Sequence, residues 1–315
     1  MSTKKVFVVF GATGTQGGSV INTFLSNNAL LEQFTLRGIT RDPLKPAAVA
    51  LADKAVIVVK ADMDDKASLR EALKDAYAVF AVTNWQEYMD VNREIQHGKN
   101  IADICKEANV QHLIWSSLPY VSKISNGKLT KVIHFDSKGF IQEYIQSLGI
   151  PSTILYLGVF TTFILSLIQP VAAGSKSLKI SIPIPSTAAL PLLSANKDVG
   201  KYVASILQNR ERFLGKEIYA ADRDYSFDEI IKILRDDGGL DISFEQCSEE
   251  DYREGMAAME FPEFLQEDMI QNGQFITEFG YFRKEKVEAG HEILTEPLQT
   301  FQEWVRKSEL IASLK

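Results

Sequence analysis

The stretch that decides the fold lies near the N-terminus and reads Lys5-Val-Phe-Val-Val-Phe-Gly-Ala-Thr-Gly-Thr-Gln-Gly17. An apolar, β-branched run leads into three glycines at three-residue spacing, and a helical pattern starts directly after them. The first glycine permits a sharp turn, the second lets the backbone approach a pyrophosphate, and the third lets the helix pack onto the strand. The N-terminus of that helix presents unpaired N–H groups to the phosphates. The stretch therefore predicts dinucleotide contacts from Gly11, Thr13, Gly14, Thr15, Gln16 and Gly17.

Outward from this unit, short apolar runs alternate with amphipathic helical stretches as far as residue 157. Such alternation is typical of parallel strands joined by helical crossovers. It predicts an α/β fold, a Rossmann-type doubly wound parallel sheet that binds ligands at the carboxyl ends of its strands. The expected strands are 5–10, 34–40, 55–60, 78–82, 112–116 and 152–157, and the expected helices are 16–27, 66–74, 92–108 and 135–148.

The second half of the chain has a different character. The alternation fades after residue 158, and a stretch rich in Pro and Ser, 170–193, is expected to separate two regions. We therefore expect an NAD(P)-binding domain over 1–157 and a smaller, mostly helical C-terminal lobe over 158–315 that contacts substrate or partner. Parts of 198–222 are expected to complete the first domain, with Asp198 capping a helix over 199–208 and a strand at 218–221 returning to the sheet. The chain is expected to end in an amphipathic element over 298–310.

The composition narrows the class of protein. The chain has 315 residues and a formal charge of −7, without the basic stripe that direct nucleic-acid binding requires. Cys105 and Cys247 cannot form a disulfide framework and lack the spacing of a zinc site, so we expect no metal and a reducing, cytoplasmic location. The N-terminal apolar run enters a glycine loop, so no signal peptide is expected. The apolar stretch 150–173 is interrupted by Pro151 and Gly158, which argues against a membrane span.

The end of the second expected strand bears on the choice of cofactor. It reads Thr40-Arg41-Asp42-Pro43, with Lys45 close by. At this position an acidic side chain favours the 2′-hydroxyl of NAD, whereas a basic one favours the 2′-phosphate of NADP. Arg41 offers a planar guanidinium that can bind a phosphate through two hydrogen bonds. We expect NADP, with NAD as the alternative, although Arg41 can also be a solvated loop residue.

The third and fourth expected strands end in residues that adjoin the path of the adenosine. Asp62 can accept a hydrogen bond from the adenine amino group, and Met63 can pack on the ring. Thr83 and Asn84 follow the fourth strand and are also expected to contact the cofactor. For Asp64 and Asp65, which follow Met63, capping of the next helix is at least as well supported.

Four segments together resemble those of a known protein family. Residues 11–20, 40–43, 82–84 and 134–139, which read GATGTQGGSV, TRDP, VTN and HFDSKG, resemble the NmrA-like proteins. These form an atypical branch of the short-chain dehydrogenase/reductase superfamily. The resemblance implies a Rossmann domain that binds NADP and often NAD, with a small C-terminal lobe. Fungal members act as regulators that respond to the cofactor redox state and bind transcription factors, whereas related branches are NADPH-dependent reductases.

The resemblance also implies catalytic positions. Active short-chain reductases carry a Tyr four residues before a Lys on one helix, so that the Lys lowers the pKa of the phenol that transfers the proton. Here Lys138 is present but His134 replaces the Tyr. Lys138 is expected to hold the nicotinamide ribose, and His134 can donate a proton or simply pack. Ser116 and Ser117 stand where the superfamily places a hydroxyl that orients the substrate, and Tyr120 is a candidate for a displaced acid.

The missing Tyr favours a binding function over catalysis. We therefore expect an NADP-binding redox sensor and regulatory protein, in the cytoplasm and also in the nucleus, with little or no catalysis. Its C-terminal lobe would signal to a protein partner such as a transcription factor. The acidic segment 249–282 is the candidate surface, although it can equally form a substrate lid. The alternative is an NAD(P)H-dependent reductase of a small carbonyl, quinone or enone. Residues 160–163, which read FTTF, depart from the Glu-Asn pair of many reductase branches.

Overall fold

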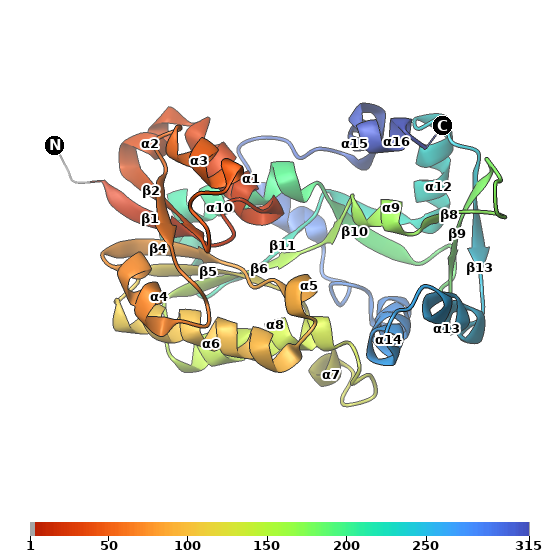
Figure 1. Ribbon diagram of the computed structural model, residues 1–315, viewed down its shortest axis with the longest axis horizontal. Coiled ribbons are helices and arrows are strands. Elements are labelled where there is room, and N and C mark those ends of the chain that lie inside the picture. The colour runs from red at the N-terminus through yellow and green to blue at the C-terminus, as the bar shows by residue number, and fades with distance from the viewer. Residues whose placement is uncertain (1–3, 315) are drawn as a thin grey trace.

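A parallel sheet forms the first part of the molecule (Figure 1). The computed structural model describes residues 4–314. The expected start of the first domain at residue 1 and the expected end of the second at residue 315 therefore lie outside the described residues. Within 4–314 this sheet has seven strands in the order β11-β6-β5-β4-β1-β2-β3, and every neighbouring pair is parallel. The order reverses between β1 and β4, which makes the end of β1 a switch point where α/β sheets bind ligands. The strands are β1 (Lys5–Val9), β2 (Phe34–Thr40), β3 (Ile57–Lys60), β4 (Ala76–Ala81), β5 (His112–Ser117), β6 (Ser152–Leu157) and β11 (Glu217–Ala220).

Helices cover both faces of this sheet, so its two apolar faces are buried in separate cores. On one face, α1 (Thr15–Leu25) packs against α10 (Ala195–Gln208). These two helices approach closely at Gly200, where a Cβ would lie 2.4 Å from the carbonyl oxygen of Ser19. The other face is covered by α4 (Lys66–Leu73), α6 (Val91–Glu107) and α8 (Ile133–Ser147) (Figure 1). The short helices α2 (Asn28–Gln33) and α3 (Pro46–Ala52) flank β2 and were not expected from the pattern.

The segment after residue 194 adds a helix and a strand to this first part. β11 pairs in parallel with β6, at the edge of the sheet. The expectation that Asp198 caps a helix over 199–208 is wrong, because α10 begins after Ser194 and Asp198 lies inside its first turn. The Asp198 carboxylate is fully buried, pairs with Lys201 at 2.8 Å and accepts a hydrogen bond from the backbone of Gln299 at 3.1 Å. Asp198 therefore holds the chain that follows residue 297 against α10.

The second part of the described chain combines helices with two three-stranded sheets, ordered β12-β10-β7 and β13-β9-β8. The stretch 170–193 was expected to be a separator, but it contains strands of both sheets. Its alternation of buried and partly buried residues over Leu178–Ile182 builds a strand. The strands are β7 (Val159–Phe160), β8 (Ile168–Pro170), β9 (Leu178–Ile182), β10 (Ala189–Leu193), β12 (Arg223–Ser226) and β13 (Ile242–Gln246).

The helices of this second part lie around the small sheets (Figure 1). They are α9 (Phe163–Ser166), α11 (Arg210–Phe213), α12 (Phe227–Asp236), α13 (Glu249–Ala258), α14 (Glu263–Phe279) and the 3₁₀ helix η1 (Val287–Ile293). The expected element over 298–310 is divided into α15 (Phe301–Lys307) and α16 (Glu309–Ala312), because Ser308 adopts extended backbone between them. In the described chain, no helix combines the length and apolar character needed to cross a membrane.

Candidate functional site

The loop between β1 and α1 has the geometry that a pyrophosphate requires. Gly11 has a φ of +60°, and the Gly14 amide donates to the Gly11 carbonyl at 2.8 Å. A Cβ at Gly17 would lie 2.2 Å from that carbonyl oxygen, so only glycine fits there. Within residues 4–314 no side chain caps α1 at Gly14, and the exposed Thr13–Thr15 backbone lies at the start of the helix. These features fit a bound dinucleotide, because uncapped helix N–H groups and a cradle without Cβ atoms suit a phosphate.

The loop is also tied to the neighbouring strand. The Ser116 hydroxyl, which is buried at the end of β5, donates to the Gln16 side chain at 2.8 Å. Gln16 was expected to contact the cofactor, but this bond connects it to the sheet. The Ser116 hydroxyl therefore connects the glycine loop to the end of β5.

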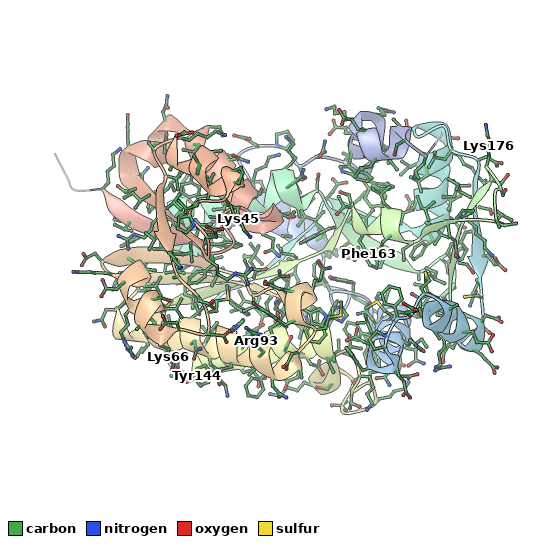
Figure 2. The ribbon with its side chains drawn as sticks, viewed as in Figure 1. Lys45, Lys66, Arg93, Tyr144, Phe163 and Lys176 are labelled. Carbon is green, nitrogen blue, oxygen red and sulfur yellow. The ribbon has the colours of Figure 1, made fainter. Side chains whose placement is uncertain are left out.

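The residues after β2 differ in what they can offer to a ligand. Asp42 Oδ1 accepts a hydrogen bond from the Leu44 amide at 3.0 Å, so this carboxylate closes its own turn. Lys45 is exposed (Figure 2), and no ion pair involves it within residues 4–314. Arg41 reaches across to the one-turn helix α5 (Trp85–Tyr88), where it pairs with Glu87 and donates to the Tyr88 hydroxyl at 2.7 Å. Arg41 is thus held by α5, and Glu87 is its ion-pair partner.

Residues 62–65, which follow β3, differ in their contacts: some remain open to a ligand, and others bind protein groups. Asp62 is exposed, and its Oδ1 accepts from the Asp64 amide at 3.0 Å. Met63 is partly buried, and its carbonyl accepts from Asn100 at 2.8 Å. Asp65 caps α4 by accepting from the Ala67 amide. Asp64 is not a cap, because its two oxygens bind Arg93 at 2.6 Å and His97 at 2.8 Å.

Lys138 lies in a buried polar cluster at the end of β4. Its ammonium donates to the Thr83 carbonyl at 3.0 Å, to the Thr83 hydroxyl at 2.5 Å and to the Glu94 carboxylate. Glu94 also accepts from Thr83 at 2.8 Å and from Ser137. An ammonium has three donors, and among the described residues all three are used in this way. Lys138 was expected to hold a ribose, but here its partners are protein groups.

The electrostatics of this cluster follow from its burial. Burial by itself raises the pKa of the Glu94 carboxyl, but the charge and hydrogen bond of Lys138 outweigh it and hold that pKa below its ordinary value. Burial lowers the pKa of Lys138, while Glu94 counteracts that shift. Each charge of the pair therefore counteracts the effect of burial on the pKa of its partner. The sequence does not single out Glu94 as a partner of Lys138, because its place in the first turn of α6 resembles that of any exposed acid near a helix start.

His134 lies one helical turn before Lys138 on α8 and forms an ion pair through Nδ1 with Asp268 of α14. Asp268 is fully buried, and its other oxygen accepts from the His134 backbone amide at 3.2 Å. The His134 side chain keeps 19% exposure, and no partner of its Nε2 is found within residues 4–314. No local pattern points to Asp268, because it lies 134 positions from His134 along the chain.

The remaining candidates have other partners. Ser117 is buried and donates to the Gln142 side chain at 3.0 Å, which occupies its hydroxyl. Tyr120 packs so tightly on α8 that a Cβ at Gly139 would lie 2.6 Å from it. Phe163 is 42% exposed and lies between the large sheet and the second part of the molecule (Figure 2). No group of three or more His, Cys, Asp or Glu side chains in the described chain is arranged to hold a metal ion.

A parallel sheet in this order, with a glycine loop at its switch point, defines an α/β protein of Rossmann type. The particular family follows from the sequence. The model of the NmrA-like family matches residues 3–305, and the chain belongs to that family. This confirms the resemblance drawn from the four segments.

Known proteins resemble the chain over most of its length. It is 27% identical over 267 residues to an NmrA-like family domain-containing oxidoreductase of Aspergillus campestris, covering 77% of this chain and 76% of that protein. The fold matches that of NmrA, a negative transcriptional regulator solved with NADP, with a TM-score of 0.80 and 19% identity over 99% of this chain and 97% of that one. It also matches an NADPH-dependent quinone oxidoreductase of Escherichia coli solved with NADPH, with a TM-score of 0.76 and 19% identity over 95% and 98% of the two chains.

Proposed function

We propose that this protein is an NAD(P)H-dependent oxidoreductase that reduces a small carbonyl, quinone or enone, with His134 as the proton donor. The observation that carries the proposal is the ion pair of His134 with the buried Asp268, one helical turn from Lys138. The relative from Aspergillus campestris is named an oxidoreductase, which supports catalysis over the sensor function that the missing Tyr favoured.

The cofactor site would be built by the chain's own loop residues. The uncapped start of α1 would bind the pyrophosphate, and Arg41 would favour NADP over NAD. A bound nicotinamide cofactor would supply the hydride. The exposed apolar residues Met259, Phe261 and Phe264 stand at the junction of α13 and α14. Phe264 precedes Asp268 by one turn and shares its side of α14, so this junction would cover an apolar substrate near His134.

The proton chemistry is assigned to His134. Addition of a hydride to a carbonyl carbon breaks the C=O π bond and leaves an alkoxide, which must gain a proton. The Asp268 carboxylate lies against Nδ1, where it would orient the ring and balance the positive charge of a protonated imidazole. The proton on Nε2 then moves to the alkoxide, and water restores it. Such general acid catalysis contributes typically about 10²- to 10⁴-fold in rate.

Lys138 has a different role in this proposal from that in reductases with a Tyr. Its three donors are occupied by Thr83 and Glu94 among the described residues, so it orients the end of β4 instead of a phenol. The cluster fixes the position of α8 relative to Thr83, at the end of β4. His134 therefore lies on a helix whose next turn is anchored to the sheet.

The test is steady-state oxidation of NADPH against panels of carbonyls and quinones. His134→Ala should lower kcat by about 10²-fold or more, the lower end of the contribution of a general acid. Affinity for NADPH should stay unchanged, because His134 contacts Asp268 and not the phosphate loop. Tyr120→Phe is the matched control and should keep its activity. Turnover that survives His134→Ala and is lost in Tyr120→Phe would assign the proton to Tyr120 and contradict the proposal.

A second function, a sensor of cofactor state, is supported by the sequestered Lys138 and by the likeness of the fold to NmrA. In that case the exposed junction at Met259–Phe264 within segment 249–282 would contact a protein partner such as a transcription factor. A sensor needs a differential affinity between two states and no reaction. Tight NADP binding without oxidation of NADPH by any member of the panels would establish this function instead.

A further inference from the structure

We propose that Glu87 sets the preference of this protein between NADP and NAD, by holding Arg41 in an ion pair that a 2′-phosphate must displace. The inference rests on the proposed binding of a dinucleotide and adds a specificity-determining residue to it. Glu87 follows β4, whereas Arg41 follows β2, and the two are 46 positions apart. The contact therefore joins two loops at the carboxyl ends of the sheet.

The Arg41 guanidinium is committed to α5 in the structure. It pairs with the Glu87 carboxylate and donates to the Tyr88 hydroxyl at 2.7 Å. The hydrogen bond to Glu87 raises the pKa of Arg41, and the same bond lowers the pKa of Glu87. Both side chains keep access to water, with 50% exposure for Arg41 and 29% for Glu87. A ligand phosphate can therefore reach Arg41, but only in competition with an ionised carboxylate.

Two other charged groups near Arg41 are less able to set the preference. Asp42, the acid adjacent in sequence, uses Oδ1 to close its own turn on the Leu44 amide. Asp62 acts on Arg41 only through its charge, without a hydrogen bond between them among the described residues. Glu87 is thus the carboxylate in direct contact with the guanidinium.

The segment that carries Glu87 is held in place by contacts that do not involve its carboxylate. The guanidinium of Arg93 lies 3.6 Å from the centre of the Tyr88 ring, and His97 meets that ring edge-on at 5.9 Å. Arg93 in turn pairs with Asp64 at 2.6 Å, and its side chain projects from the start of α6 (Figure 2). Removal of the charge at Glu87 should therefore leave α5 where it is, so Glu87→Gln tests the charge alone.

The two cofactors would meet this pair differently. A 2′-phosphate must compete with the Glu87 carboxylate for Arg41, and the two anions repel each other. A 2′-hydroxyl is neutral and can donate to a carboxylate, which is the interaction that favours NAD. Glu87 therefore weakens NADP and either leaves NAD unchanged or strengthens it.

The experiment measures the affinities of the full chain for NADP⁺ and NAD⁺ by calorimetric titration. Glu87→Gln should tighten NADP⁺ about 1.5- to 5-fold, the range for the loss of an exposed ion pair, without tightening NAD⁺. The gain should vanish in the Arg41→Ala background, because it acts through Arg41. Glu107→Gln is the matched control, since Glu107 forms a similar exposed pair with Arg70 on the other end of α6 and should change neither affinity.

Three results would overturn the inference. An unchanged ratio of NADP⁺ to NAD⁺ affinity in Glu87→Gln would show that Glu87 does not set the preference. The same gain in the Arg41→Ala background would assign it to general charge and not to the pair. If wild-type protein binds neither cofactor, the proposed function fails as well, whereas binding with an unchanged ratio defeats the inference alone.

Discussion

Two ion pairs stand at the carboxyl ends of the same sheet and differ in their access to water. In Arg41–Glu87 the side chains keep 50% and 29% exposure, whereas in Lys138–Glu94 they keep 9% and 2%. Water and salt screen the first pair, so it contributes little to stability and can exchange its partner. The second pair is almost completely removed from water, so each charge depends on the other.

The difference bears on the ligand contacts expected of Arg41 and Lys138. Arg41 was singled out as a reader of phosphate, and its exposed pair leaves it available for that role. Lys138 was singled out as a ribose contact, yet its donors are used within the described chain by Thr83 and Glu94. Arg41 therefore keeps access to solvent, whereas the donors of Lys138 face protein groups.

The largest expected effect comes from removal of one partner of the buried pair. Glu94→Ala should lower the free energy of unfolding by about 3–5 kcal/mol at neutral pH, because Lys138 is left as an uncompensated buried charge. Burial lowers the pKa of Lys138, so the loss should shrink as pH rises and the folded protein releases that proton. Urea unfolding at several pH values measures both effects.

A double substitution sharpens that result. Glu94→Leu with Lys138→Met replaces both charges by apolar groups and should recover most of the loss. A double variant as unstable as Glu94→Ala would show that shape or hydrogen bonding, and not the uncompensated charge, explains the effect.

A third buried polar group, without a carboxylate partner, extends the comparison. Burial, with a smaller contribution from Arg210, lowers the pKa of His112 to about 4, and its Nε2 contacts the Thr153 hydroxyl at 2.8 Å. The unfolded chain binds this proton near pH 6.5. The contribution of neutral His112 to the free energy of unfolding is therefore complete above about pH 6.5. This contribution falls by about 3 kcal/mol as the pH is lowered toward 4.

The comparison variant is His112→Asn, which has no titrating ring. The difference in unfolding free energy between wild type and variant should shrink from pH 7 to pH 4, measured by urea unfolding at each pH. A difference that stays constant over this range would mean that His112 titrates alike in the folded and unfolded states.

The smallest expected effect is that of the exposed pair on stability. Glu87→Ala should lower the free energy of unfolding by no more than about 1 kcal/mol, and less in high salt. Thermal unfolding at low and high salt measures it beside Glu94→Ala. A loss above about 2 kcal/mol would make Arg41–Glu87 a structural contact and would remove the distinction between the two pairs.

Local pattern predicted the large sheet well and the second part of the chain less well. β1, β2, β5 and β6 lie within one residue of their expected bounds, because continuous apolar runs mark buried parallel strands. The pattern over 170–193 predicts a separator instead of strands, since β9 and β10 are short and prolines lie in and beside them. The pattern predicts a cap at Asp198 because an acid before an apolar helix often is one, whereas in the fold its carboxylate accepts a hydrogen bond from the distant Gln299.

The sequence by itself determined the strand, glycine loop and helix at the start of the chain, because their contacts join residues close in sequence. Gly11, Gly14 and Gly17 meet within one turn, and their spacing alone specifies that close approach. Only the tertiary structure decided which acid meets each basic group. Arg41–Glu87, Lys138–Glu94 and His134–Asp268 join residues 46, 44 and 134 positions apart. The interaction between two charges depends on the distance between them and on their burial, and the local spacing of residues specifies neither. These partners therefore appear only once the chain is folded.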